Sequence, residues 1–321
     1  MANKYFRNLI LVLISILIVS ILIAIFKGSV NLGVKELFFA QNSAILNLRI
    51  WRVIVAIISG IGLSVSGIVL QVILRNPLAE PYLLGTSSGA GLGAIIAIML
   101  GLSGLYMPLF AFIGAILTVI FVCAIATQGN KINEQSLILS GVIVSVAISA
   151  VIVFLVSISG NQSLHELTWW LWGSFSVYDF KLVILVSFIV LIGSGVVYAF
   201  WQDLNAISLG EEDAIHLGIN IERVKKILIV VCSLITASLV CICGIIGFVG
   251  LMIPHMVRLA IGINHRMLIP LSAVSAAIFM VICDVVSRTA FQPLEIPIGV
   301  ITAIFGAPVF ILLLKRRQLV K

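Results

Sequence analysis

Charged side chains are scarce in this sequence. Only 10% of its 321 residues are Asp, Glu, Lys or Arg, whereas 62% are hydrophobic, and the mean hydropathy is +1.28. In soluble domains about a quarter of the residues are charged, so this composition excludes a water-soluble enzyme. Apolar runs of about 20 residues are long enough to cross a bilayer as helices. The sequence therefore predicts an all-α, polytopic membrane protein.

The sequence motifs of catalysis and of metal binding are missing as well. There is no GK dipeptide and hence no phosphate-binding loop of the Walker A type, and there is no HExxH motif. The five cysteines lie inside apolar stretches without a CxxC pair, and the four histidines are scattered. We therefore expect a chain that is not an enzyme, with no catalytic residue, no metal site and no cofactor of its own.

The few charged residues divide the chain into countable apolar stretches. Two of these stretches are too long for one helix, and glycines divide them near 101–104 and near 244–250. The sequence then predicts ten transmembrane helices, at 9–26, 53–74, 83–100, 109–126, 137–156, 182–200, 227–244, 248–261, 267–286 and 296–314.

Lysine and arginine give the predicted orientation. With a cytoplasmic N-terminus, thirteen of the nineteen Lys and Arg residues fall on the cytoplasmic side and six outside, the six including Lys35. Cytoplasmic loops of membrane proteins are enriched in these residues. We therefore expect both termini in the cytoplasm, including the basic C-terminal stretch 315–321, and we interpret the net charge of +7 as loop charge rather than a nucleic-acid site.

The longest predicted cytoplasmic segment, 203–226, has an internal pattern. Gly210 and Gly218 bracket a short stretch whose first turn holds three acidic residues, which suits the N-terminal end of a helix dipole. This pattern favours a short helix that docks a cytoplasmic partner, and a solvated loop is the alternative. On the opposite side, the stretch 167–175 has three tryptophans in four residues, which favours a helix lying in the outer membrane interface.

Evidence for an ion pathway is thin. Asp284 and Arg288 stand four residues apart, and we expect them to form a pair within one helix. A proton-coupled carrier would need further carboxylates within the membrane. Their scarcity counts against a secondary transporter that works without an ATPase, which is the alternative class of function.

Three motif blocks resemble one family of membrane proteins. Residues 75–81 read RNPLAEP and are followed by LLGTSSGA at 83–90; residues 244–255 read GIIGFVGLMIPH; and IPIGVIT at 296–302 precedes GAPVF at 306–310. Spread in this order across the chain, they resemble the FecCD-like permeases, the membrane subunits of ABC importers for ferric siderophores, haem and cobalamin.

This resemblance implies a type II importer permease with ten helices in a single domain, 1–321, in the cytoplasmic membrane of a prokaryote. It implies a second permease subunit, identical or paralogous, two cytoplasmic ATPases that hold ATP and Mg²⁺, and an extracytoplasmic substrate-binding protein. The favoured cargo is a ferric siderophore, with haem and cobalamin as alternatives.

The resemblance also implies roles for individual residues. The segment 203–226 matches the coupling helices that contact the ATPase, through Leu209, Gly210, Glu211, Glu212, Ala214, Leu217 and Gly218. External arginines that would bind the substrate-binding protein correspond to Arg49, Arg52 and Arg288. The pathway would be lined mainly by the fifth and tenth helices, with Gln135, Ser136, Ser140 and Ser145 as candidates on the fifth.

Overall fold

The computed structural model describes residues 2–30, 33, 36–102, 104–129, 131–159, 161–176 and 179–319. The predicted positions Lys35 and Lys321 lie outside these residues. The α-helices are α1 (Ala2–Phe26), α2 (Ser43–Ile73), α3 (Thr86–Met99), α4 (Tyr106–Ala126), α5 (Glu134–Ile158), α6 (Asn161–Leu171), α7 (Phe180–Ala199), α8 (Trp201–Leu209), α9 (Glu211–His216), α10 (Ile221–Cys243), α11 (Val249–Ile261), α12 (His265–Thr289) and α13 (Ile298–Leu319). Three short 3₁₀ helices, η1 (Glu36–Phe38), η2 (Ala40–Asn42) and η3 (Pro81–Leu84), and one antiparallel hairpin of β1 (Thr127–Gln128) and β2 (Lys131–Ile132) complete the described part. The all-α prediction is confirmed.

The predicted spans fall on helices. Within the described residues, seven helices are long and apolar enough to cross a membrane: α1, α2, α4, α5, α7, α10 and α12. Three shorter apolar helices, α3, α11 and the first part of α13, stand where the other three spans are predicted. The ten predicted positions are thus occupied by apolar helices, of which seven reach the full spanning length.

Polar capping residues start four of these helices. Asn133, Asp179, Asn220 and Asn264 precede α5, α7, α10 and α12, and each side chain accepts a hydrogen bond from a backbone N–H of the first turn. These N–H groups have no partner within the helix, so a side-chain acceptor stabilises each start by about 1 kcal/mol.

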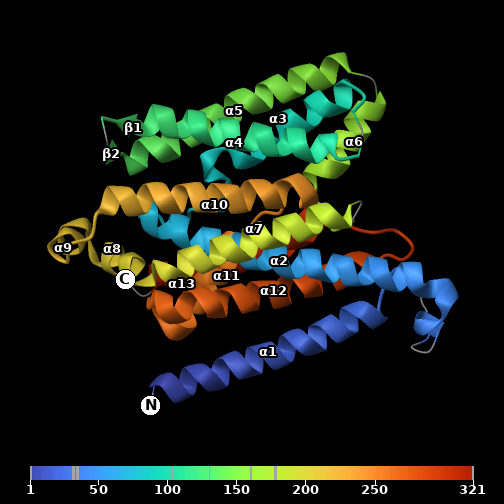
Figure 1. Cartoon of the computed structure of the whole chain (residues 1–321), viewed down its shortest axis with the longest axis horizontal. Coiled ribbons are helices and arrows are strands. Elements are labelled where there is room, and N and C mark those ends of the chain that lie inside the picture. Colours follow the sequence, from blue (N-terminus) through green and yellow to red (C-terminus); the bar gives the residue numbers. More distant parts are fainter. Residues whose placement is uncertain are drawn as a thin grey trace.

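Helix α2 forms the centre of the bundle, as Figure 1 shows, with α10 and α12 along it. In its most apolar stretch 83% of the residues are buried, against 11% in α1 and in α5. Helices α3, α4 and α5 form a group on the far side of α10, and α1 lies along α12 at the opposite edge. The exposed apolar sides of α1 and α5 therefore remain for lipid or for another subunit.

Close helix crossings occur where a glycine faces the backbone of a neighbouring helix. A side chain on Gly67 of α2 would collide with the backbone of Gly250 in α11, and one on Gly93 of α3 would collide with the carbonyl of Phe110 in α4. In a lipid environment such small residues allow backbones to approach and pack.

The break between α10 and α11 lies where the sequence predicts it. Gly244 and Phe248 both have positive φ values, 68° and 69°, and the four residues 244–247 are not helical. Helix α11 starts directly after Phe248 and has 13 residues. At 1.5 Å per residue its length is about 20 Å, which is too short to span a bilayer core of about 30 Å.

Candidate functional site

The segment 203–226 contains the predicted short helix. Helix α9 covers Glu211–His216 between Gly210 (φ 155°) and Gly218 (φ 80°). Its Ala214 is fully buried in the core that includes Leu204 and Val224. In contrast, Leu209, Ile215 and Leu217 are 61–67% exposed. One side of this segment is thus fixed to the bundle, and the other presents apolar side chains to the surroundings.

This segment lies at one end of the molecule. Helices α8 and α9, the β1–β2 hairpin, the start of α1 and the end of α13 gather at the left of Figure 1, whereas α6 lies at the opposite end. The arrangement agrees with the prediction that both termini share a side with the segment 203–226. Helix α6 ends at Leu171, so only the first part of the tryptophan-rich stretch 167–175 is helical.

Four charged side chains meet where α9, α10, the start of α5 and the residues just after α2 come together; we call them the α9 ion network (Arg75, Glu134, Glu211 and Lys225). Lys225 Nζ lies 2.6 Å from Glu134 Oε1 and 2.6 Å from Glu211 Oε1. Arg75 approaches the same two carboxylate oxygens at 4.0 and 3.2 Å. The hydrogen bond from Lys225 is the main reason why the pKa of the Glu211 carboxyl lies below its usual value.

The predicted pathway residues lie at different depths on α5. Gln135 is exposed, and Ser136 is half-buried, with its backbone N–H held by Asn133. Ser140 is buried, and its hydroxyl donates at 3.4 Å to the carbonyl of Val122 in α4. Ser145 is half-buried, and its hydroxyl accepts from Ser88 of α3 at 3.3 Å. Ser140 and Ser145 therefore contact neighbouring helices of this chain, and their place along a pathway stays a prediction.

The three predicted docking arginines lie together at the opposite end, and their guanidinium groups have partners within the chain. Arg49 is 4% exposed and donates to the carbonyls of Ile25, Phe26 and Val30. Arg288 is 2% exposed and donates to the carbonyls of Ala24 and Lys27. These carbonyls belong to the end of α1 and the residues after it, so the two arginines satisfy acceptors that a helix end leaves open.

Arg52 differs from Arg49 because its partners are carboxylates rather than backbone carbonyls. Its guanidinium lies 3.0 Å from Asp284 Oδ1 and 2.7 Å from Glu295 Oε2. Asp284 also pairs with Arg288 at 2.7 Å, which confirms the predicted pair within α12. A role of these arginines in docking stays a prediction, and it would require them to exchange partners within the chain for carboxylates of another protein.

A buried carboxylate that the sequence did not single out holds the break between α10 and α11. Glu80 Oε1 accepts a hydrogen bond from the backbone N–H of Phe248 at 2.7 Å, and the Tyr82 hydroxyl accepts from the N–H of Ile246 at 3.2 Å. Both acceptors belong to the RNPLAEP block and its extension, and both donors to the GIIGF block. The first two sequence blocks are therefore in contact in the fold.

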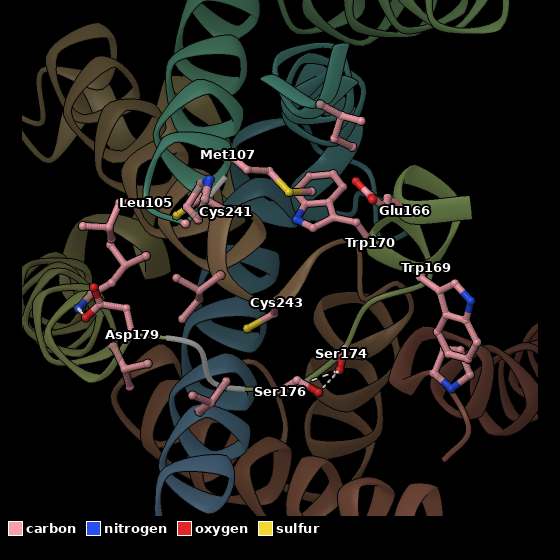
Figure 2. A pocket seen from close by; sticks show the side chains of 18 of the residues that line it. Leu105, Met107, Glu166, Trp169, Trp170, Ser174, Ser176, Asp179, Cys241 and Cys243 are labelled. Atoms are coloured by element: carbon pink, nitrogen blue, oxygen red, sulfur yellow. Dashed lines mark hydrogen bonds between the residues drawn. The ribbon is translucent and has the colours of Figure 1, made fainter. Parts of the chain in front are cut away.

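Near the α6 end the chain forms a partly open pocket of about 750 Å³. Figure 2 shows Trp169 and Trp170 on one side of it, with Glu166 close by, and Asp179 on the other. Between them, Ser174 and Ser176 form a hydrogen bond at 2.9 Å. The sequence offered only the tryptophan cluster as a signal, because the lining residues come from several distant segments.

The cysteines of the described chain are free, and four of the five are buried. Within the described residues no three His, Cys, Asp or Glu side chains come together in a group that could hold a metal ion.

Comparison with known proteins gives a family match over most of the chain. The model of the FecCD transport family matches residues 16–316. A cobalamin import system permease protein, BtuC, from Halobacterium salinarum is 40% identical over 273 residues, which cover 84% of this chain and 73% of the relative. A hemin transport system permease protein, HmuU, from Yersinia pestis is 34% identical over 316 residues, covering 93% of this chain and 94% of the relative.

A solved structure gives the same relationship in three dimensions. A protein described as a metal-chelate type ABC transporter in an inward-facing conformation superposes with a TM-score of 0.87 at 31% sequence identity. The match covers 97% of this chain and 99% of that one.

Proposed function

Because the chain belongs to the FecCD transport family and is the permease subunit of an ABC importer for metal chelates, we propose that its cargo is a ferric siderophore. Haem and cobalamin are the alternatives, since relatives named for hemin and cobalamin import match most of this chain. The chain is a transport subunit, and ATP with Mg²⁺ would be bound and hydrolysed by two separate ATPase chains.

The observation that supports a role as an ATP-driven importer subunit is the two-sided segment around α9. Its buried residue Ala214 fixes it to the bundle, and its exposed apolar residues Ile215 and Leu217 form a contact surface at one end of the molecule. Exposed apolar side chains that are grouped on one short segment, here Leu209, Ile215 and Leu217, are typical of a surface that a partner covers. We assign that surface to the ATPase, and this end of the molecule would then face the cytoplasm, in line with the proposal that both termini are cytoplasmic.

The other partners follow from the exposed helices and from the opposite end. A second permease subunit, identical or paralogous, would cover the exposed side of α5, including Leu139, Ile143 and Val146. A substrate-binding protein would bind near Arg49, Arg52 and Arg288 on the extracytoplasmic side of the membrane. Charges at such a rim mainly affect the rate and orientation of association.

The test is ATP-dependent uptake by the purified complex. The tagged chain, isolated in mild detergent together with its ATPase, would be reconstituted in proteoliposomes and supplied with its binding protein and a radiolabelled ferric siderophore. Uptake that needs ATP supports the importer, and competition with haem and cobalamin identifies the cargo. Uptake that proceeds without ATP or an ATPase would instead support a secondary transporter.

A further inference from the structure

Lys225 lies one turn into α10 and is almost completely buried, with 2% of its side chain exposed. A buried ammonium group is costly unless acceptors surround it. Here it has two, the carboxylates of Glu134 and Glu211, each at 2.6 Å. By contrast, Arg223, two residues earlier on the same helix, is exposed.

The two acceptors come from helix starts. Glu211 is the first residue of α9, and Glu134 is the first residue of α5. A carboxylate in the first turn is favoured by the helix dipole. Lys225 therefore joins the starts of two helices that are 77 positions apart in the sequence, as counted from Glu134 to Glu211.

The two helices differ in how firmly they are otherwise held. Helix α9 has only six residues, and Ala214 is the one that is buried. In the most apolar stretch of α5 only 11% of the residues are buried. The buried residues of the whole helix lie towards its start, at Leu137, Ser140, Gly141 and Val144. The start of α5 is thus the part of this helix that other parts of the chain can move.

Additional contacts hold together the starts of α5, α9 and α10. Glu222, in the first turn of α10, accepts a hydrogen bond from the N–H of Ile132 at 3.0 Å, just before α5. Arg75, at the end of α2, reaches Glu211 at 3.2 Å. These charged groups thus connect the residues just after α2, the short helix α9 and the start of α5.

We propose that Lys225 is a positioning residue of the transport cycle, which links α9 to the start of α5 through Glu211 and Glu134. A movement imposed on α9 by the ATPase is transmitted through this link to α5, the helix expected to line the pathway. The inference rests on the proposed function, because it needs an ATPase that moves α9.

The experiment compares uptake per ATP hydrolysed in the reconstituted complex. Glu134→Gln keeps the side-chain shape, removes the charge on α5 and leaves the Lys225–Glu211 pair in place. Lys225→Met removes the link altogether, Lys225→Arg keeps a cation there, and Arg223→Met is the matched control on an exposed position of the same helix. Monodispersity in detergent and the amount of ATPase bound check that each variant is folded and assembled.

Uptake per ATP is expected to fall on the order of tenfold in Glu134→Gln and in Lys225→Met, which is a usual size for coupling between two sites. Lys225→Arg should retain most of the wild-type ratio, and Arg223→Met should be unchanged. Hydrogen exchange gives a second readout. On addition of ATP, exchange in 134–140 should change in the wild type and stay constant in Glu134→Gln, whereas α9 remains protected by the ATPase in both.

Two negative results are distinguishable. If the wild-type complex shows no ATP-driven uptake, the proposed function is wrong. If the wild type transports and Glu134→Gln transports equally well per ATP, with the same exchange response in 134–140, the role of Lys225 is wrong and the importer assignment stands. Should Lys225→Met not assemble, Glu134→Gln and Lys225→Arg carry the test.

Discussion

The carboxylate of Glu80 accepts a hydrogen bond from the backbone N–H of Phe248, 168 residues further along the chain, at 2.7 Å. Phe248 has a positive φ of 69° and directly precedes α11, so its amide has no acceptor in a preceding helix turn. Glu80 supplies this acceptor from the segment after α2. The carboxylate therefore stabilises the non-helical stretch that lets the chain turn back from α10 into α11.

Replacing Glu80 tests this account. Glu80→Ala removes the acceptor of the Phe248 amide in this half-buried bond, which should lower the free energy of unfolding by about 1 kcal/mol. Glu80→Gln keeps an oxygen that can accept the bond and should cost less. Thermal unfolding of the detergent-solubilised protein measures both. Equal losses in the two variants would contradict the role of the hydrogen bond.

A second prediction concerns the apolar surface beside α9. Ile215→Ser and Leu217→Ser remove exposed apolar groups without disturbing the core, so the chain should fold normally and bind its ATPase more weakly. Burial of one such side chain contributes about 1.5–3 kcal/mol, so the affinity should fall by roughly tenfold or more.

Titration of the purified chain with its ATPase measures the effect. Ile263→Ser is the matched control, because Ile263 is 57% exposed in the turn between α11 and α12. Unchanged affinity in both α9 variants would show that the ATPase binds elsewhere.

A third prediction concerns Arg49. Its guanidinium donates hydrogen bonds to three backbone carbonyls, two at the end of α1 and one shortly after it. A lysine at this position is a single point charge and cannot match the fork of donors. Arg49→Lys should therefore increase hydrogen exchange in 24–30 and lower the free energy of unfolding by about 1–3 kcal/mol. Arg223→Lys, at an exposed position, is expected to change neither quantity. Normal protection of 24–30 in Arg49→Lys would be the contrary result.

A fourth prediction compares how much Arg52 and Arg49 contribute to the association of the substrate-binding protein. Among the three, Arg52 has the most exposed side chain, at 11%, and its partners are carboxylates rather than backbone carbonyls. Arg52→Gln should therefore slow association of the binding protein more than Arg49→Gln does. The association rate should also depend less on salt, since a rim charge has been removed. Surface plasmon resonance over a range of ionic strength measures this, and identical kinetics in wild type and Arg52→Gln would exclude the assignment.

Much of the fold could be predicted because the signals are local. Charged residues bound each apolar stretch, and Gly244 already marks the break before α11. The bracketing glycines Gly210 and Gly218 likewise predicted the short helix α9. In each case the residues that decide the structure are neighbours in the sequence.

The contacts within the site could not be predicted in this way. Lys225 stands beside Arg223 and Lys226, and nothing in the sequence distinguishes the buried one from its neighbours. Its partner Glu134 is 91 residues away, and only the packing of α10 against the start of α5 brings them together. The bonds of Arg49 and Arg288 to backbone carbonyls could not be predicted for the same reason, since those carbonyls belong to the end of α1 and to the residues after it.

The attachment of α1 has a consequence for how the molecule is assembled. The residues at its far end are held by side chains of α2 and α12, and most of its apolar surface stays outside the core. The central bundle closes around α2 and needs little from α1 to fill its interior. The first helix therefore lies at the edge of the bundle, where Arg49 and Arg288 bind the carbonyls at and after its end. Substitutions on its exposed apolar side should be tolerated as long as these carbonyls stay within reach of the two arginines.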